Sequence, residues 1–224
     1  MKLVFGFVCA LFYSFMSFGQ ITQWTDINYA NDSLEGHKLD IYLPDGGQTE
    51  YKVVVLIYGS AWFANNMKQM AFQAMGKPLL DGGFAVVSIN HRSSGDAKFP
   101  AQINDVKAAV RFIRAHADEY RLDTSFIGIT GFSSGGHLSS LAGTTNGVKV
   151  YKVGDTEMDI EGNVGDCTSF SSRVDAVVDW FGPIDMTRME NCATTKGVDS
   201  PEAALIGGTP AEHMDVLTLL NPMT

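Results

Sequence analysis

The sequence predicts an α/β fold, in which a mostly parallel central sheet carries helices on both faces. Three observations support this prediction: apolar runs of strand length recur, amphipathic segments of helix length separate them, and the earliest strands alternate polar and apolar residues. Alternating strands and helices favour a parallel sheet, because each crossover helix packs back onto the sheet. The 224 residues suit one large domain, and 45% hydrophobic residues suffice for a sizeable core.

The elements can be followed along the chain. Residues 26–30 and 37–43 alternate polar and apolar side chains, which is typical of two antiparallel strands at a sheet edge. Further along, the expected strands are residues 53–57, 84–89, 126–130 and 174–180. The expected helices are residues 68–80, 101–120, 134–144 and 210–220. Residues 101–120 form the clearest helix, because apolar residues recur there every three or four positions.

The first nineteen residues have the organisation of a signal peptide. Lys2 precedes the apolar run 3–13, and the small residues Ser17 and Gly19 precede an expected cleavage site before Gln20. The run is shorter than a bilayer span, so we expect no membrane anchor. We therefore predict a secreted or periplasmic protein, with a mature domain at residues 20–224.

The net charge restricts the expected classes of binding partner, and the cysteine content bears on a disulfide. The net charge of −9 and the pI near 4.9 disfavour nucleic acid and anionic membrane surfaces as partners. Cleavage removes Cys9 and leaves Cys167 and Cys192. In an oxidising compartment we expect these two to form a disulfide, the alternative being two unpaired thiols in loops.

Residues 131–135 read Gly-Phe-Ser-Ser-Gly and join an expected strand to an expected helix. A G-x-S-x-G sequence in this context is typical of the nucleophile elbow of serine hydrolases. Ser133 is therefore the candidate nucleophile. The alternative is a glycine-rich turn without chemistry.

Four segments resemble one known family. They are Tyr-Gly-Ser-Ala-Trp at 58–62, a segment at 89–102 that contains His-Arg-Ser-Ser-Gly and Phe-Pro-Ala-Gln, the serine motif at 131–137, and Val-Val-Asp-Trp-Phe-Gly-Pro at 177–183. Over residues 24–224, the chain resembles secreted bacterial members of the α/β-hydrolase superfamily. The resemblance is to the esterase/lipase branch that includes feruloyl and acetyl-xylan esterases and is related to hormone-sensitive-lipase-like enzymes.

The resemblance implies an oxyanion hole beside the serine. In this family one donor is the backbone N–H after the nucleophile, here Ser134, and the others come from the loop after the third strand. Ser60 and Ala61 are the candidates in that loop. The family's leading histidine is Tyr58 here, and His91 stands where relatives usually have tyrosine.

The family places its triad acid and base after the 177–183 segment, in strands that this sequence does not reach. We expect about six of eight strands, with an apolar sheet edge exposed. His137 is expected to pack beside its helix, and His213 to be structural on a surface helix. Asp185 is the alternative acid. Without a triad histidine the serine is a poor nucleophile, so we predict that the chain is inactive as it stands.

Residues 148–166 read as an inserted hairpin with one acidic, solvated face. A calcium site is the alternative for these carboxylates, but the spacing does not match an EF-hand loop, and we predict no metal. The resemblance implies no organic cofactor.

The sequence thus predicts, by resemblance, a serine carboxylic ester hydrolase that removes acetyl or feruloyl groups from carbohydrate esters through a Ser133 acyl-enzyme. The expected partner is a small-molecule or polysaccharide ester, and the oligomeric state stays open. Two alternatives also stay open: a serine peptidase of the prolyl-oligopeptidase type, and a non-catalytic pseudoenzyme or binding protein.

Overall fold

The computed structural model describes residues 21–191 and 194–223, so the predicted signal peptide lies outside the described part. Six strands form the main sheet: β1 (Thr22–Asn28), β2 (Lys38–Leu43), β3 (Tyr51–Ile57), β4 (Ala85–Ile89), β5 (Leu122–Phe132) and β8 (Ala176–Trp180). Their order across the sheet is β1-β2-β4-β3-β5-β8. The helices that flank the sheet are α1 (Lys68–Ala71), α2 (Lys77–Asp81), α3 (Ala101–Ala115) and α4 (Ser134–Thr144).

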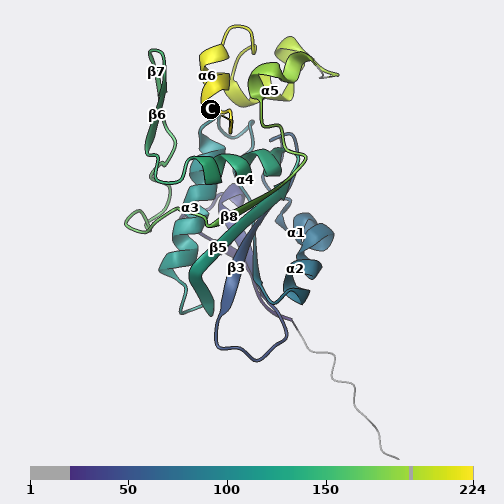
Figure 1. Ribbon diagram of the computed structural model, residues 1–224, viewed down its shortest axis with the longest axis vertical. Helices are drawn as coiled ribbons and strands as arrows, with labels where there is room; N and C mark the ends of the chain where they lie inside the picture. The colour runs from purple at the N-terminus through teal and green to yellow at the C-terminus, as the bar shows by residue number, and fades with distance from the viewer. Residues whose placement is uncertain (1–20, 192–193, 224) are drawn as a thin grey trace, which may run out of the picture.

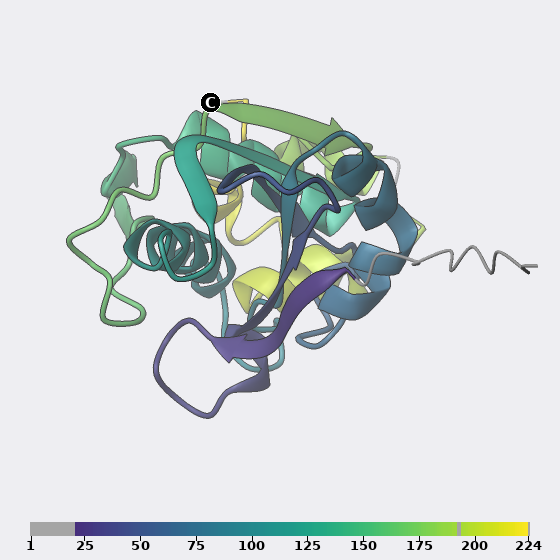
Figure 2. The same cartoon turned by 90° about the horizontal axis from the view of Figure 1, so that it is seen from below.

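Helices cover both faces of the sheet, which confirms the predicted fold class. Helices α3 and α4 lie on one face, and the α1–α2 segment lies on the other (Figures 1 and 2). Strands β3, β4, β5 and β8 run parallel, whereas β1 and β2 are antiparallel additions at one edge. Strand β4 is buried along its whole length, as expected for a parallel strand covered on both faces.

Two of the predicted helices that flank the sheet differ from the observed ones. The helix expected at 68–80 contains a π-helical turn, Phe72–Gly76, between α1 and α2. A Cβ at Gly76 would collide with the Phe72 ring, which stacks on Tyr42 with centroids 3.5 Å apart. Helix α3 ends at Ala115 instead of residue 120, because the chain turns there to enter β5 and Tyr120 packs edge-on against Trp24.

The predicted hairpin is present as β6 (Val150–Val153) and β7 (Thr156–Asp159). Asp155, Glu157 and Asp159 are exposed, as expected for a solvated acidic face. Glu161 is an exception, because it turns inward to form ion pairs with Lys107 (3.2 Å) and Arg111 (2.5 Å) of α3. The hairpin is thus tied to the body by a buried charge cluster.

The C-terminal part of the described chain lies beyond one end of the sheet (Figure 1). It contains the 3-10 helices η3 (Met186–Asn191) and η4 (Gly197–Asp199), followed by α5 (Pro201–Ile206) and α6 (Met214–Leu219). The helix expected at 210–220 is shorter than predicted, and it is not a simple surface helix. Leu217 and Leu220 are buried in the main core, so α6 contributes to the packing of the domain.

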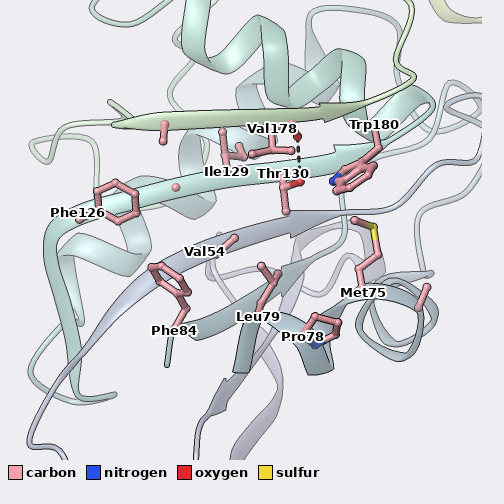
Figure 3. A pocket seen from close by; sticks show the side chains of 13 residues that line it. Val54, Met75, Pro78, Leu79, Phe84, Phe126, Ile129, Thr130, Val178 and Trp180 are labelled. Atoms are coloured by element: carbon pink, nitrogen blue, oxygen red, sulfur yellow. Dashed lines mark hydrogen bonds between the residues drawn. The ribbon is translucent and has the colours of Figure 1, made fainter. Parts of the chain in front are cut away.

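Strand β8 forms the outer edge of the sheet, with Val177, Val178 and Trp180 partly exposed. A groove of about 510 Å³ runs between the sheet and the α1–α2 segment and is lined almost entirely by apolar side chains. Figure 3 shows Trp180 and Met75 at one end and Phe84 and Phe126 at the other. The exposed apolar edge expected from the sequence is therefore present in this structure.

Candidate active site

Ser133 lies in a sharp turn between β5 and α4, which is the strand–turn–helix context predicted for it. Its backbone angles, φ 53° and ψ −125°, are rarely adopted by L-residues. Two hydrogen bonds of 3.0 Å hold the turn: Ser133 N–H donates to Trp180 O, and His137 N–H donates to Ser133 O. Backbone strain of this kind persists where surrounding contacts enforce it, and it clusters at functional sites.

Glycines allow the close approaches that the turn requires. A Cβ at Gly131 would lie 2.5 Å from the backbone of Gly135, and a Cβ at Gly135 would collide with the carbonyl of Tyr58. A Cβ at Gly59 would lie 2.7 Å from the Cβ of Ser133. The loop after β3 is therefore pressed against the candidate nucleophile.

A cavity of about 360 Å³ opens beside Ser133. Three parts of the chain form its wall: the loop after β3, the turn at Ser133, and the segments that follow β8. They contribute Ala61 and Trp62, Ser133 and Ser134, and a mostly apolar set that includes Phe181 and Glu202. Trp62 and Glu202 were not among the predicted site residues. For Glu202 the reason is that no local sequence pattern connects it to the serine motif.

The three predicted oxyanion donors differ in their surroundings. Ser134 is the first residue of α4, where backbone N–H groups have no acceptor within the helix. Ala61 lines the cavity with a positive φ of 50°. The Ser60 N–H, however, donates a 2.9 Å hydrogen bond to Ser134 Oγ. The Ser60 amide is therefore already occupied in this structure, and the geometry favours Ser134 and Ala61 among the three predicted donors.

Packing and hydrogen bonds of Tyr58 hold the loop after β3 in place. The Tyr58 ring stacks on His91 with centroids 4.9 Å apart, and Tyr58 OH donates to Ala64 O at 3.1 Å. Burial lowers the pKa of His91. The next residue, Arg92, forms an ion pair of 2.6 Å with the buried Asp105 at the start of α3. His91 thus takes part in the packing that fixes the loop.

His137 does not approach the Ser133 hydroxyl. Its Nε2 makes a 2.9 Å hydrogen bond to Leu220 O, and its ring packs at right angles to Trp62. Burial lowers the pKa of His137 to about 4, so the ring is neutral at pH 7 and Nε2 donates this bond. The prediction that His137 packs beside its helix is confirmed.

No histidine completes the site within the described residues. All five histidines of the chain are described, and none lines the cavity or forms a side-chain hydrogen bond with the Ser133 hydroxyl. His213 lies just before α6, beside Gly208. Asp185, the alternative acid, accepts a 2.6 Å hydrogen bond from Thr187 and does not line the cavity either. The structure therefore does not bring Asp185 to the serine.

The predicted disulfide is not formed at Cys167. This residue is a free cysteine that packs against apolar side chains of the main core, and burial raises the pKa of its thiol. Cys192, its expected partner, lies outside the described residues.

Across residues 21–191 and 194–223, which include the acidic hairpin, no three His, Cys, Asp or Glu side chains gather as a metal site requires. Over the same residues, no helix has the length and apolar character needed to cross a membrane.

Sequence comparisons relate the chain to esterases. A family described as BD-FAE matches residues 39–224. The probable carboxylic ester hydrolase LipM of Mycobacterium tuberculosis is 37% identical over 168 residues, which is 74% of this chain and 36% of LipM. Esterase LipC of the same organism is 30% identical over 171 residues, which is 76% of this chain and 40% of LipC. The chain thus spans well under half the length of these curated relatives.

Two solved structures are similar in both sequence and fold. A bifunctional GH43-CE protein from Bacteroides eggerthii is 79% identical with a TM-score of 0.88, and the match covers 90% of this chain and 28% of that one. A truncated carbohydrate esterase from gut microbiota is 59% identical with a TM-score of 0.87, and the match covers 90% of this chain and 71% of that one.

Proposed function

Because the chain belongs to the BD-FAE family of α/β-hydrolase esterases, we propose that it is a serine carboxylic ester hydrolase with Ser133 as its nucleophile. One observation carries the proposal: Ser133 is held at a strained φ of 53° in the wall of a cavity of about 360 Å³. An energetically unfavourable backbone at a cavity wall is what a presented nucleophile requires.

In the proposed reaction, Ser133 Oγ attacks the carbonyl carbon of the ester, and the alcohol leaves as the acyl-enzyme forms. Water then attacks the acyl-enzyme and releases the acid. The N–H groups of Ser134 and Ala61 are the proposed donors to the developing oxyanion. The Ser133 proton must pass to a base and then to the leaving alcohol.

The base is the missing part of this mechanism. Since no histidine of the chain lines the cavity, we propose that the 224-residue chain alone hydrolyses esters at a strongly reduced rate. Loss of a triad histidine lowers kcat by roughly 10⁴-fold or more in well-studied serine hydrolases. Sequencing the gene beyond the Thr224 codon tests this step. A frame that continues into a strand, an aspartate and a histidine predicts that the extended protein is active.

For the substrate, we propose carbohydrate esters bearing acetyl or feruloyl groups. The two similar structures, at 79% and 59% identity, are described as a GH43-CE protein and a carbohydrate esterase, which supports this class. An exported location, inferred from the first nineteen residues, would bring the protein to such substrates.

A fluorophosphonate probe tests the nucleophile. The probe should form a covalent adduct that mass spectrometry localises to Ser133, and Ser133→Ala should abolish it. Ser139→Ala is the matched control, because Ser139 is a buried serine of α4 whose hydroxyl donates to Gly135 O and lies outside the cavity wall. An adduct at another serine, or equal labelling in both variants, would refute the proposal. Release of acetate from acetylated xylo-oligosaccharides then tests the substrate class.

One observation favours a second candidate, a non-catalytic binding protein. The absence of a histidine from the cavity wall leaves Ser133 without an activating base. If the gene ends after Thr224 and no acyl-enzyme forms, while sugar esters still bind to the cavity, this second function replaces the first.

A further inference from the structure

Two residues that line the Ser133 cavity, Trp62 and Glu202, each carry a buried polar atom without a hydrogen-bond partner in the described structure. The two atoms are Nε1 of Trp62 and Oε2 of Glu202. Both side chains are buried, with exposed fractions of 2% and 4%. Buried donors and acceptors are nearly always paired in folded proteins, so two unpaired groups in one cavity wall need an explanation.

Both residues are held firmly in place. Trp62 adopts a φ of 61°, its carbonyl accepts a 2.8 Å hydrogen bond from Ser94 N–H, and its ring packs against His137. Glu202 is the second residue of α5, whose N-cap Ser200 accepts a 3.1 Å hydrogen bond from Ala203 N–H. The unpaired atoms therefore belong to fixed elements, and neither side chain is a mobile surface group.

Helix α5 is itself anchored to the body of the domain. Phe99 N–H donates to Leu205 O at 3.0 Å, and Lys98 Nζ donates to Ala204 O at 2.8 Å. The segment at 98–99 thus fixes the position of Glu202 relative to the serine turn.

The chemistry of the wall restricts what can satisfy both atoms. Apart from Ser133, Ser134, Trp62 and Glu202, the described residues of the wall have apolar side chains or are glycine, and Glu202 is the only charged residue among those described. Trp62 Nε1–H can only donate, and the Glu202 carboxylate can only accept. A hydroxyl group complements both, because it accepts from the indole and donates to the carboxylate. A carboxylate ligand cannot donate, and an ammonium ligand cannot accept.

We propose that Trp62 and Glu202 together bind a hydroxyl group of the alcohol part of the substrate, beside the ester that Ser133 attacks. This inference rests on the proposed function and deepens it. The preferred substrate is an ester of a polyol or sugar that keeps a free hydroxyl near the acylated one. Both atoms are closed to bulk water, so binding includes side-chain movements of Trp62 and Glu202 that open these atoms to the cavity. Sites built to bind a hydroxyl discriminate strongly against analogues that lack it.

The test is a titration of the ¹⁵N-labelled chain followed by NMR of the indole N–H signals. The chain has three tryptophans, Trp24, Trp62 and Trp180, and Trp62→Phe assigns the signal of Trp62. The probe is methyl β-D-xylopyranoside. The control is 2-methoxytetrahydropyran, which has the same ring and acetal without hydroxyls. We expect the xyloside to shift the Trp62 signal and leave the Trp24 signal in place, and the control compound to shift neither.

Glu202→Gln supplies the second arm of the test. We expect it to weaken xyloside binding by about tenfold, because it removes the charge of the acceptor. Glu212→Gln is the matched control, since Glu212 is exposed and lies outside the cavity wall. It should leave binding unchanged. If Trp62→Phe does not fold, Trp24→Phe and Trp180→Phe assign the Trp62 signal by elimination, and the Glu202 variant still decides the question.

Three results would overturn the inference. The first is no Trp62 shift at saturating xyloside, and the second is an equal shift with both compounds. The third is a Trp62 signal that moves in Glu202→Gln without sugar and does not respond to sugar, which would indicate a direct Trp62–Glu202 hydrogen bond. This outcome is separate from that of the fluorophosphonate test. Sugar binding at Trp62 without a Ser133 adduct retains this inference and rejects catalysis by Ser133. A Ser133 adduct without sugar binding at Trp62 rejects this inference and retains the proposed nucleophile.

Discussion

The backbone N–H of Ser60 donates a 2.9 Å hydrogen bond to Oγ of Ser134, 74 residues away in the chain. This bond joins the loop after β3 to the residue that follows the candidate nucleophile. It also occupies one of the amides that the family resemblance suggested as an oxyanion donor. The loop is therefore positioned by a side chain within the serine motif itself, and the amides of Ser134 and Ala61 remain as the proposed oxyanion donors.

Ser134→Ala should loosen this loop. The change removes the acceptor of the Ser60 amide, and losing one buried hydrogen bond destabilises a protein by about 1 kcal/mol. We expect faster hydrogen exchange at the Ser60 amide and a lower unfolding free energy in urea. Ser134→Thr keeps the hydroxyl and is the control. Unchanged exchange at Ser60 in the alanine variant would show that the bond does not hold the loop.

The strained backbone at Ser133 predicts that a glycine variant is more stable than an alanine variant there, which reverses the usual order of stability in a helix. With φ at 53°, Ser133→Gly should be more stable than Ser133→Ala, because glycine adopts positive φ without steric conflict. At Ser139, inside α4, the order should be the opposite, with glycine less stable than alanine by about 1 kcal/mol. Unfolding midpoints of the four variants provide the measurement. The same order at both positions would contradict the strained turn.

His137 should make the domain sensitive to acid. Burial lowers its pKa to about 4 in the folded chain, below the ordinary value of 6.5. Between pH 6.5 and 4 the unfolded chain therefore binds the proton more readily, and the unfolding free energy should fall as the pH falls. His137→Gln should flatten this part of the profile, whereas His213→Gln should not. If the unfolding free energies of wild type and His137→Gln depend on pH in the same way, His137 is not the origin of the acid sensitivity.

Glu161 should be the strongest electrostatic anchor of the inserted hairpin. Its carboxylate pairs with Lys107 and Arg111, whose side chains are each only 1% exposed. Glu161→Ala leaves two buried cations without their partner, so we expect a loss of about 3–5 kcal/mol in unfolding free energy. Glu157→Ala, at an exposed position of the same hairpin, should change the unfolding free energy by less than about 0.5 kcal/mol. Equal effects of the two variants would contradict the buried pairing.

The apolar groove beside β8 should bind hydrophobic probes and favour aggregation. Val178 lies in its wall and is 50% exposed on the edge strand. Lysine at sheet edges opposes edge-to-edge association. Val178→Lys should reduce the fluorescence of bound anilinonaphthalene sulfonate. It should also reduce the fraction of the protein that sediments as aggregate. Val198→Lys changes an exposed valine outside the groove and should leave both unchanged. A groove variant that binds as much dye as wild type would place the binding elsewhere.

Residues close together in the chain determined much of the fold prediction. The apolar runs at β3 and β4, the helical stripe of α3 and the strand–turn–helix context of Ser133 were all predictable. Each depends on side-chain periodicity or on turn chemistry within a few residues. The predicted helix lengths were less accurate, as for α3, because the position where a helix ends depends on what its last turn packs against.

The sequence by itself therefore determined the α/β fold class, the turn that presents Ser133 and the loop that faces it. Only the tertiary structure decided that Ser60 N–H is occupied by Ser134 Oγ, that Glu161 pairs with two buried cations of α3, and that α6 packs into the core. It also brought Trp62 and Glu202 to one cavity wall from positions 140 residues apart. The physical reason is that these contacts depend on the relative placement of distant segments, which chain packing sets and which local pattern does not encode.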